Sequence, residues 1–226
     1  MDFNLLTKKI EKHFEEGLPF VVYSLPNQEG VAALLQKSPE LSTISELTAN
    51  GFILAPFEYN DSTFFIPENE SEIVSAELSE NTIELTPVPV AKNASERKTY
   101  LEKVQKTIDN IKRRRATKIV ISRPKDFPLS NFSLKQLLER LFGVYPSAFR
   151  YIWYHPQTGM WCGATPETLV RVETDSFKTM ALAGTQPFYN SEKVSWGPKE
   201  LDEQQMVTDS ITNSLQRVTS VLKVSN

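Results

Sequence analysis

Four short polar motifs follow one another in the second half of this 226-residue chain, each embedded in apolar sequence. They are Lys118-Ile-Val-Ile-Ser-Arg, Gly163-Ala-Thr-Pro-Glu, Ala181-Leu-Ala-Gly-Thr and Lys199-Glu-Leu-Asp-Glu. Together they supply an amine, a loop carboxylate, a glycine turn and two carboxylates at helical spacing. Such a set suits acid–base chemistry on an anionic substrate that a metal ion holds.

The first motif predicts a strand that carries a candidate base, Lys118. Side chains alternate along a strand, so Lys118 shares one face with Val120 and Ser122, while isoleucines occupy the other. Apolar residues on both faces indicate partial burial, which disfavours the charged form of an amine. Lys118 is therefore a candidate base. The alternative is a lysine at a strand end that extends its amine into solvent.

The second motif places a carboxylate, Glu167, at a predicted corner between two strands. Pro166 disfavours the helical conformation of Thr165, so the corner is tight and directs the following side chain. A carboxyl group shielded there by Trp161 can keep its proton and act as an acid. The alternative is a turn glutamate in solvent.

The third motif ends a predicted strand at Gly184. A glycine lets backbone N–H groups approach a ligand closely, and Thr185 adds a hydroxyl donor. Simple termination of the strand explains the same residues.

The fourth motif places Glu200 and Glu203 on one face at the start of a predicted helix. The apolar stripe that follows from Val207 extends this face, which indicates that both carboxylates point toward the core. Two such carboxylates need positive charge between them, and Mg²⁺ is one solution. The alternative is an exposed pair that favours the helix N-terminus. A zinc site is not expected, because histidines and cysteine do not cluster.

Patterning predicts an α+β fold, with helices and short strands in blocks. Helical segments are expected at residues 5–16, 31–36, 95–115, 133–142 and 198–222. Strands are expected at residues 20–23, 51–55, 62–66, 82–85, 118–122, 148–154, 160–163, 168–173 and 177–183. Residues 67–95 read mainly as a long connection. We expect an N-terminal α+β subdomain over residues 1–92 and the first part of a catalytic domain over residues 93–226.

Composition excludes several classes of protein. The net charge of −3 gives no long-range attraction for nucleic acid, and the arginines at 113–115 have no wider basic surface around them. No apolar run is long enough for a transmembrane helix, and the first residues are unlike a signal peptide. Cys162 is the single cysteine, so no intrachain disulfide forms. A cytoplasmic protein without nucleic-acid or membrane partners is expected.

The four motifs, in this order, resemble those of the chorismate-utilising enzymes, a family that includes isochorismate synthase, salicylate synthase, anthranilate synthase component I and aminodeoxychorismate synthase. The resemblance is good from about Ser95 onward and looser before it. It implies an anthranilate synthase component I-like chorismate-binding fold with mixed or antiparallel sheets and flanking helices. The fold would be incomplete, because family enzymes continue beyond the helix that begins near Pro198.

The resemblance also implies a role for each motif. Lys118 matches the residue that activates the nucleophile, which is lysine in members that add water and usually glutamine in members that add ammonia. Glu167 matches the acid that protonates the departing hydroxyl group. Gly184 and Thr185 match the turn that contacts a substrate carboxylate, and Glu200 and Glu203 match ligands of Mg²⁺.

The implied function is that of a Mg²⁺-dependent isochorismate synthase, which adds water at carbon 2 of chorismate and removes the carbon 4 hydroxyl for menaquinone or siderophore biosynthesis. A salicylate synthase and a non-catalytic fragment of the domain are the alternatives. Gln204 departs from the family, which usually has histidine there. Because the second half of the family domain is missing, we expect little activity from this chain alone and self-association through uncovered apolar surface.

Overall fold

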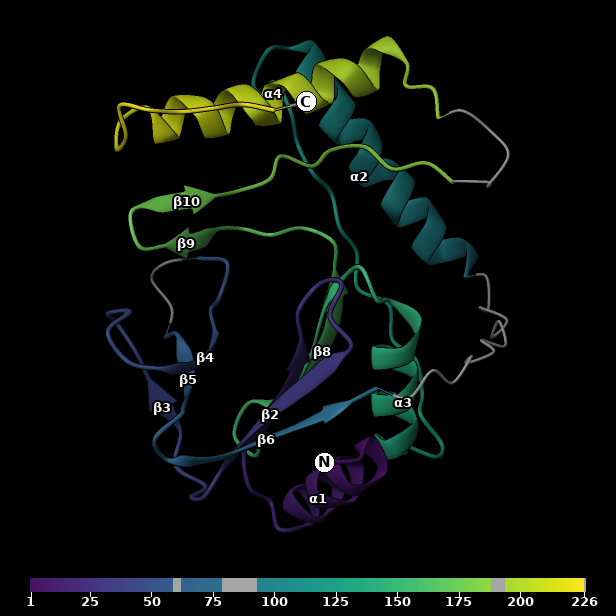
Figure 1. Cartoon of the computed structure of the whole chain (residues 1–226). Helices are drawn as coiled ribbons and strands as arrows, with labels where there is room; N and C mark the ends of the chain where they lie inside the picture. The colour runs from purple at the N-terminus through teal and green to yellow at the C-terminus, as the bar shows by residue number, and fades with distance from the viewer. Residues whose placement is uncertain (59–61, 79–92, 188–193, 226) are drawn as a thin grey trace. The chain divides into compact units, whose positions relative to one another are not determined.

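The computed structural model describes residues 1–58, 62–78, 93–187 and 194–225 (Figure 1). Contacts divide the chain into two compact units. The first unit combines Met1–Thr86 with Leu129–Thr168, and the second combines Pro87–Pro128 with Leu169–Asn226. Each unit therefore takes segments from both sides of the predicted boundary at residue 92. This division does not test the domain boundary predicted at residue 92, which stays a prediction.

The first unit is built on a five-stranded antiparallel sheet with the order β6-β2-β1-β7-β8. Its strands are β1 (Phe20–Ser24), β2 (Gly30–Gln36), β6 (Ser71–Glu77), β7 (Phe149–His155) and β8 (Gly159–Thr165). β1 lies in the middle, where all but one of its residues are buried. The sheet joins segments that are more than a hundred residues apart in the sequence, since Phe20 is paired with Tyr154.

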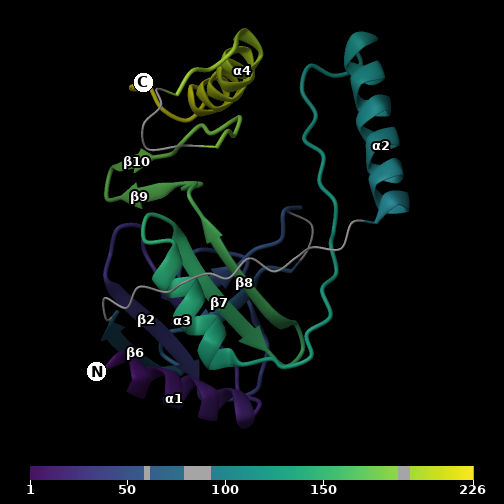
Figure 2. The same ribbon diagram turned by 90° about the vertical axis from the view of Figure 1, so that its right-hand side faces the viewer.

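Two helices, α1 (Phe3–Glu15) and α3 (Leu134–Val144), cover one face of this sheet (Figure 2). Leu6 and Ile10 from α1 and Leu138 from α3 are fully buried against β-strand residues. Asp2 and Ser133 cap the helices, each accepting a backbone N–H with its side chain. The predicted helices are confirmed, although Leu6, and not Leu5, faces the core.

A small sheet packs on the opposite face, with the order β3-β5-β4. Its strands are β3 (Ser42–Thr43), β4 (Gly51–Leu54) and β5 (Phe64–Pro67). Ile66 from β5 and Trp153 from β7 are fully buried in the cluster between the two sheets. β4 and β5 are paired antiparallel, and they confirm the strands predicted at residues 51–55 and 62–66.

Two predictions for the first unit are wrong. Residues 31–36 form β2 and not a helix, because the strand lies between β1 and β6 and packing on both faces overrides the helical preference of alanine and leucine. The predicted connection after residue 67 contains β6, where Val74 and Ala76 are buried and the two glutamates are exposed. The strand predicted at residues 82–85 lies outside the described residues.

The second unit contains α2 (Ala94–Lys112), α4 (Pro198–Leu215) and the antiparallel hairpin of β9 (Arg171–Glu173) and β10 (Ser176–Lys178). Neither helix has a buried residue, in contrast to α1 and α3. Asn93 caps α2, accepting the N–H groups of Ser95 and Glu96 with its side chain, so the helix begins one residue before the predicted start at residue 95. α4 ends before residue 222, where the sequence predicted its end.

The predicted strand at residues 118–122 is absent, and only Phe177 and Lys178 of the predicted strand 177–183 lie in a strand, β10. Residues 118–129 have no regular structure, and the side chain of Val120 is 82% exposed. A strand needs a neighbour for its backbone hydrogen bonds. The described part of the chain pairs no strand with residues 118–122, which accounts for the difference.

The architecture is α+β, as predicted, with antiparallel sheets and flanking helices. Across the described ranges, no helix combines the length and apolarity that a membrane crossing requires.

Candidate active site

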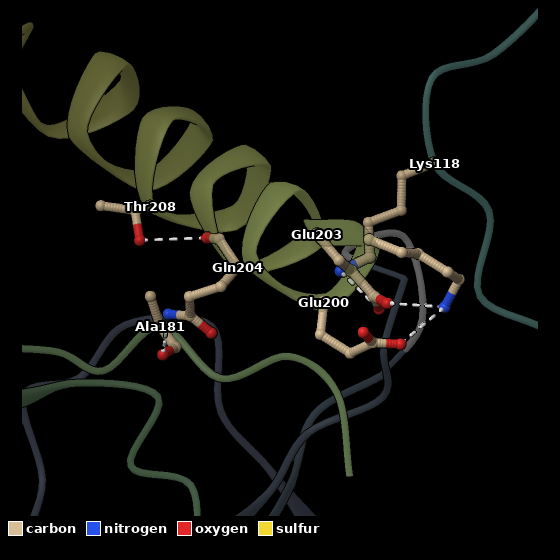
Figure 3. A network of polar contacts seen from close by, with 7 residues as sticks. Lys118, Ala181, Glu200, Glu203, Gln204 and Thr208 are labelled. Atoms are coloured by element: carbon tan, nitrogen blue, oxygen red, sulfur yellow. Dashed lines mark hydrogen bonds and ion pairs between the residues drawn. The ribbon is translucent and has the colours of Figure 1, made fainter. Parts of the chain in front are cut away.

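The first two turns of α4 carry the two predicted metal ligands, Glu200 and Glu203 (Figure 3). Pro198 begins the helix, and Gly197 precedes it without a side-chain cap. The spacing of three places both carboxylates on one side of α4. Their side chains are 35% and 30% exposed, so they are neither buried in a core nor fully solvated.

Two lysines meet these carboxylates. Lys118 Nζ lies 3.3 Å from Glu203 Oε1, and Lys199 Nζ lies 3.7 Å from Glu203 Oε2 and 3.7 Å from Glu200 Oε1 (Figure 3). Lys199 is 81% exposed, so its pairs are weak and screened by salt. The Lys118 side chain is 25% exposed, which makes its pair with Glu203 the better shielded one. The carboxylate pair therefore already attracts positive charge.

The predicted substrate turn packs against the same part of α4. Gly184 has a φ of 65°, in the left-handed region that glycine tolerates. A Cβ added to Gly184 would lie 3.4 Å from Trp196 Cζ3 and 3.8 Å from Glu200 Cγ. Gly184 and the exposed Thr185 thus lie beside the first turn of α4, next to one of the carboxylates.

A hydrogen bond joins α4 to the irregular segment that leads to this turn. Gln204 Nε2 donates to the backbone oxygen of Ala181 over 2.8 Å (Figure 3). Both residues are partly buried. Between this segment and α4 lies a groove of about 430 Å³ that includes Gln204, Thr208 and Ile211.

Glu167 lies just after β8, in the first unit, and its side chain is exposed. Its backbone N–H donates to Thr165 Oγ1 over 3.2 Å, which confirms the predicted turn. The predicted shielding by Trp161 is not observed, because Trp161 lies on an edge strand and is itself 57% exposed. The second unit thus brings Lys118, Gly184, Thr185 and the two glutamates together, while Glu167 belongs to the first unit.

The donor set can hold a hard cation. Glu200 and Glu203 provide carboxylate oxygens, and Mg²⁺ is usually bound by one or two carboxylates with water and substrate oxygens. A Cβ added to Gly197 would lie only 2.8 Å from Glu200 Oε2, so this glycine provides the space into which the carboxylate folds. Among the residues that the structure describes, no three histidine, cysteine or acidic side chains form a group that could hold a metal ion, so the protein supplies at most this pair of carboxylates.

Three contacts at the site were not foreseen from the sequence. Lys199 pairs with both carboxylates, Trp196 packs on Gly184, and Gln204 holds Ala181. The signal for Lys199 was its position directly before Glu200, four residues from Glu203. The contacts of Trp196 and Gln204 depend on the tertiary approach of residues 181–185, which no local pattern encodes.

Comparisons with known proteins show the family to which the sequence is similar. A family model described as chorismate binding enzyme matches residues 46–226. The anthranilate synthase component 1 of Methanothermobacter thermautotrophicus is 32% identical over 157 residues, which is 63% of this chain and 33% of that protein. The salicylate biosynthesis isochorismate synthase of Pseudomonas aeruginosa is 27% identical over 140 residues, which is 58% of this chain and 29% of that protein.

The chain thus aligns with about a third of the length of the curated relatives it matches. No solved structure matches it.

Proposed function

This chain belongs to the family of chorismate-binding enzymes, and we propose that it contributes to a Mg²⁺-dependent isochorismate synthase. The observation that carries the proposal is the contact between Lys118 and Glu203. This contact places a candidate base and a candidate metal ligand close enough to act on one substrate. The resemblance of the Lys118 motif to the water-adding members of the family selects the reaction.

In this proposal each side chain has one task. Lys118 in its neutral form accepts a proton from the water that attacks carbon 2 of chorismate. Glu203 would favour the ammonium form less once its charge is neutralised by Mg²⁺. Glu167 donates a proton to the hydroxyl group that leaves carbon 4. One water is added and one is lost, so the product is an isomer of the substrate. The two residues act in opposite protonation states, as an acid–base pair must.

The remaining residues bind and orient the substrate. Gly184 and Thr185 offer backbone N–H groups and a hydroxyl to a substrate carboxylate, and their position beside Glu200 supports this role. Glu200 and Glu203 would hold Mg²⁺. When bound, this ion supplies the positive charge that neutralises a substrate carboxylate. The product would enter menaquinone or siderophore biosynthesis.

A second candidate function is the addition of ammonia, as in an anthranilate synthase. The 32% identity to an anthranilate synthase component 1 favours it, whereas Lys118 favours the addition of water. A third candidate, a salicylate synthase, would use the same residues and then eliminate pyruvate. The three give different products from chorismate, namely isochorismate, an aminated ring, or salicylate with pyruvate.

The experiment is product analysis on the full-length protein, by which we mean the complete polypeptide that contains these residues. The protein is incubated with chorismate, Mg²⁺ and an ammonium salt, and the products are separated by liquid chromatography. Isochorismate as the main product supports the proposal. An aminated product or salicylate would replace it with one of the other two candidates.

We also propose that the 226-residue chain alone binds chorismate weakly and self-associates. The helices of the second unit bury none of their residues, and large apolar side chains on and after α4 are exposed, among them Leu201, Val218 and Val221. Apolar surface of this kind favours association. Light scattering should detect species larger than a monomer, and a monomer at all concentrations would contradict the proposal.

A further inference from the structure

We propose that Gln204 is a positioning residue that couples the metal-binding pair on α4 to the substrate turn at Gly184. The inference rests on the proposed function and deepens it. Its basis is the hydrogen bond from Gln204 Nε2 to the backbone oxygen of Ala181, over 2.8 Å. This bond links two segments that carry different parts of the site.

The two residues that this bond joins are close in sequence to the metal-binding pair and to the substrate turn. Gln204 directly follows Glu203, and Ala181 lies three residues before Gly184. The backbone of α4 is rigid between Glu203 and Gln204 because both residues lie inside the helix. A displacement of the Glu203 backbone therefore moves Gln204 with it, and the hydrogen bond passes that movement to Ala181.

A second contact holds the other end of the same segment. The α-carbon of Gly184 approaches Trp196 and Glu200 so closely that an added Cβ would touch both. Residues 181–184 are thus attached to α4 at two points. One is the polar bond at Ala181 (Figure 3), and the other is the packing of Gly184 against Glu200. With both attachments in place, Mg²⁺ bound by Glu200 and Glu203 would fix the turn that receives the substrate.

Glutamine is suited to this task. Its neutral amide donates to a carbonyl oxygen at any physiological pH, which a carboxylate cannot do. Gln204 is also partly buried, so water competes less for the bond than on an open surface. Thr208 Oγ1 donates to the backbone oxygen of Gln204 over 3.1 Å, so this bond does not use the side-chain amide that contacts Ala181.

The test follows the backbone amides of Gly184 and Thr185 by NMR while Mg²⁺ is added to the 226-residue protein. In the wild type we expect both amide signals to shift with the same midpoint as the signals of residues 200–203. In Gln204→Met, which keeps the side-chain length and removes the donor, Mg²⁺ should bind within about twofold of the wild-type affinity, since the carboxylates remain. The shifts at Gly184 and Thr185 should fall to less than about a third, because one attachment is lost.

The neighbouring glutamine provides a matched control. Gln205 Nε2 donates to Asp209 Oδ1 over 2.7 Å on the exposed side of α4. Gln205→Met removes a similar bond from the same helix without touching residues 181–185. We expect the full response of Gly184 in this variant. An equal loss in both variants would mean a general effect on α4 and would overturn the inference.

Other outcomes separate this inference from the proposed function. If Mg²⁺ binds and Gln204→Met keeps the full response of Gly184, the coupling role is wrong and the metal site stands. If the signals of the wild-type protein do not shift with Mg²⁺, or if the same shifts persist in Glu203→Gln, the metal site and the coupling are both wrong. If Gln204→Met does not fold, the coupling is tested by amide hydrogen exchange at Gly184 and Thr185 in the wild-type protein. Mg²⁺ should slow the exchange of both amides at least about threefold, and unchanged exchange rates would overturn the coupling.

Discussion

Lys118 Nζ lies 3.3 Å from Glu203 Oε1, so an amine from the irregular segment after α2 meets a carboxylate from the start of α4. The two residues are far apart in the sequence and belong to one compact unit. Lys118 lies in a segment without regular secondary structure. Its ion pair with Glu203 is therefore one of the contacts that hold the lysine in position. In the proposed function, the pair links the base to the metal site.

Replacement of Lys118 by methionine should reduce the turnover of chorismate in the full-length protein at least about a hundredfold, because general base catalysis contributes that much or more. Folding should be retained, since a partly exposed ion pair adds little to the free energy of unfolding. Steady-state kinetics and circular dichroism measure the two effects. Lys112→Met, at the exposed end of α2, is the matched control and should keep normal turnover. Near-normal turnover in Lys118→Met would remove its assignment as the base.

Glu167→Gln should reduce turnover about as strongly as Lys118→Met, because an amide has the same shape as a carboxyl group but cannot give up the proton that the departing hydroxyl needs. The side chain is exposed, and the turn is held by the bond from the Glu167 backbone N–H to Thr165 Oγ1, which the substitution keeps, so the variant should fold normally. Glu173→Gln changes another exposed glutamate, on β9, and should leave the rate unchanged. Equal rates in Glu167→Gln and the wild type would show that the acid lies elsewhere.

Glu203→Gln should weaken the binding of Mg²⁺ at least about tenfold. Loss of a group that only orients a metal ligand already lowers metal affinity by about that factor, and removal of a charged ligand should lower it at least as much. Isothermal titration calorimetry measures the affinity. Asp202→Asn removes the adjacent negative charge from an exposed position of the same helix and is the control. If the two variants lose affinity equally, the ion responds to the charge of the helix N-terminus and not to a defined ligand.

Protein stability should fall between pH 7.5 and pH 5.5 because of His155. Its ring is buried in the first unit, Nδ1 accepts the N–H of Gln157, and burial lowers the pKa of His155 below the ordinary value of 6.5. The unfolded chain therefore takes up a proton at a higher pH than the folded chain. The stability due to the neutral ring is complete above about pH 6.5 and is lost as the pH falls toward the lower folded pKa.

Thermal unfolding at the two pH values tests this linkage. His155→Gln should flatten the pH dependence, whereas His13→Gln, which leaves His155 in place, should retain it. His13 is the matched control because it is the other histidine in the chain. A wild-type unfolding temperature that does not change between the two pH values would contradict the prediction.

The sequence was informative where local patterns decide the structure. Local patterns predicted α1 and α3, and the spacing of Glu200 and Glu203 placed both on one side of α4. It failed where tertiary contacts decide. Residues 31–36 have a helical composition but are paired on both sides as β2.

Lys118 shows the same limit at the site. Its alternating apolar neighbours are typical of a strand, but a strand forms only beside a partner, and the described residues provide none. The contact with Glu203 is instead made by an irregular segment. The bond between Gln204 and Ala181 joins positions twenty-three residues apart, a relationship that no periodicity reports.

The most direct test of the central claim is the identity of the product that the full-length protein forms from chorismate, Mg²⁺ and an excess of ammonium salt. The account predicts isochorismate, its formation dependent on Mg²⁺ and lost in Lys118→Met. An aminated product, or isochorismate formed at the same rate without Lys118, would contradict it.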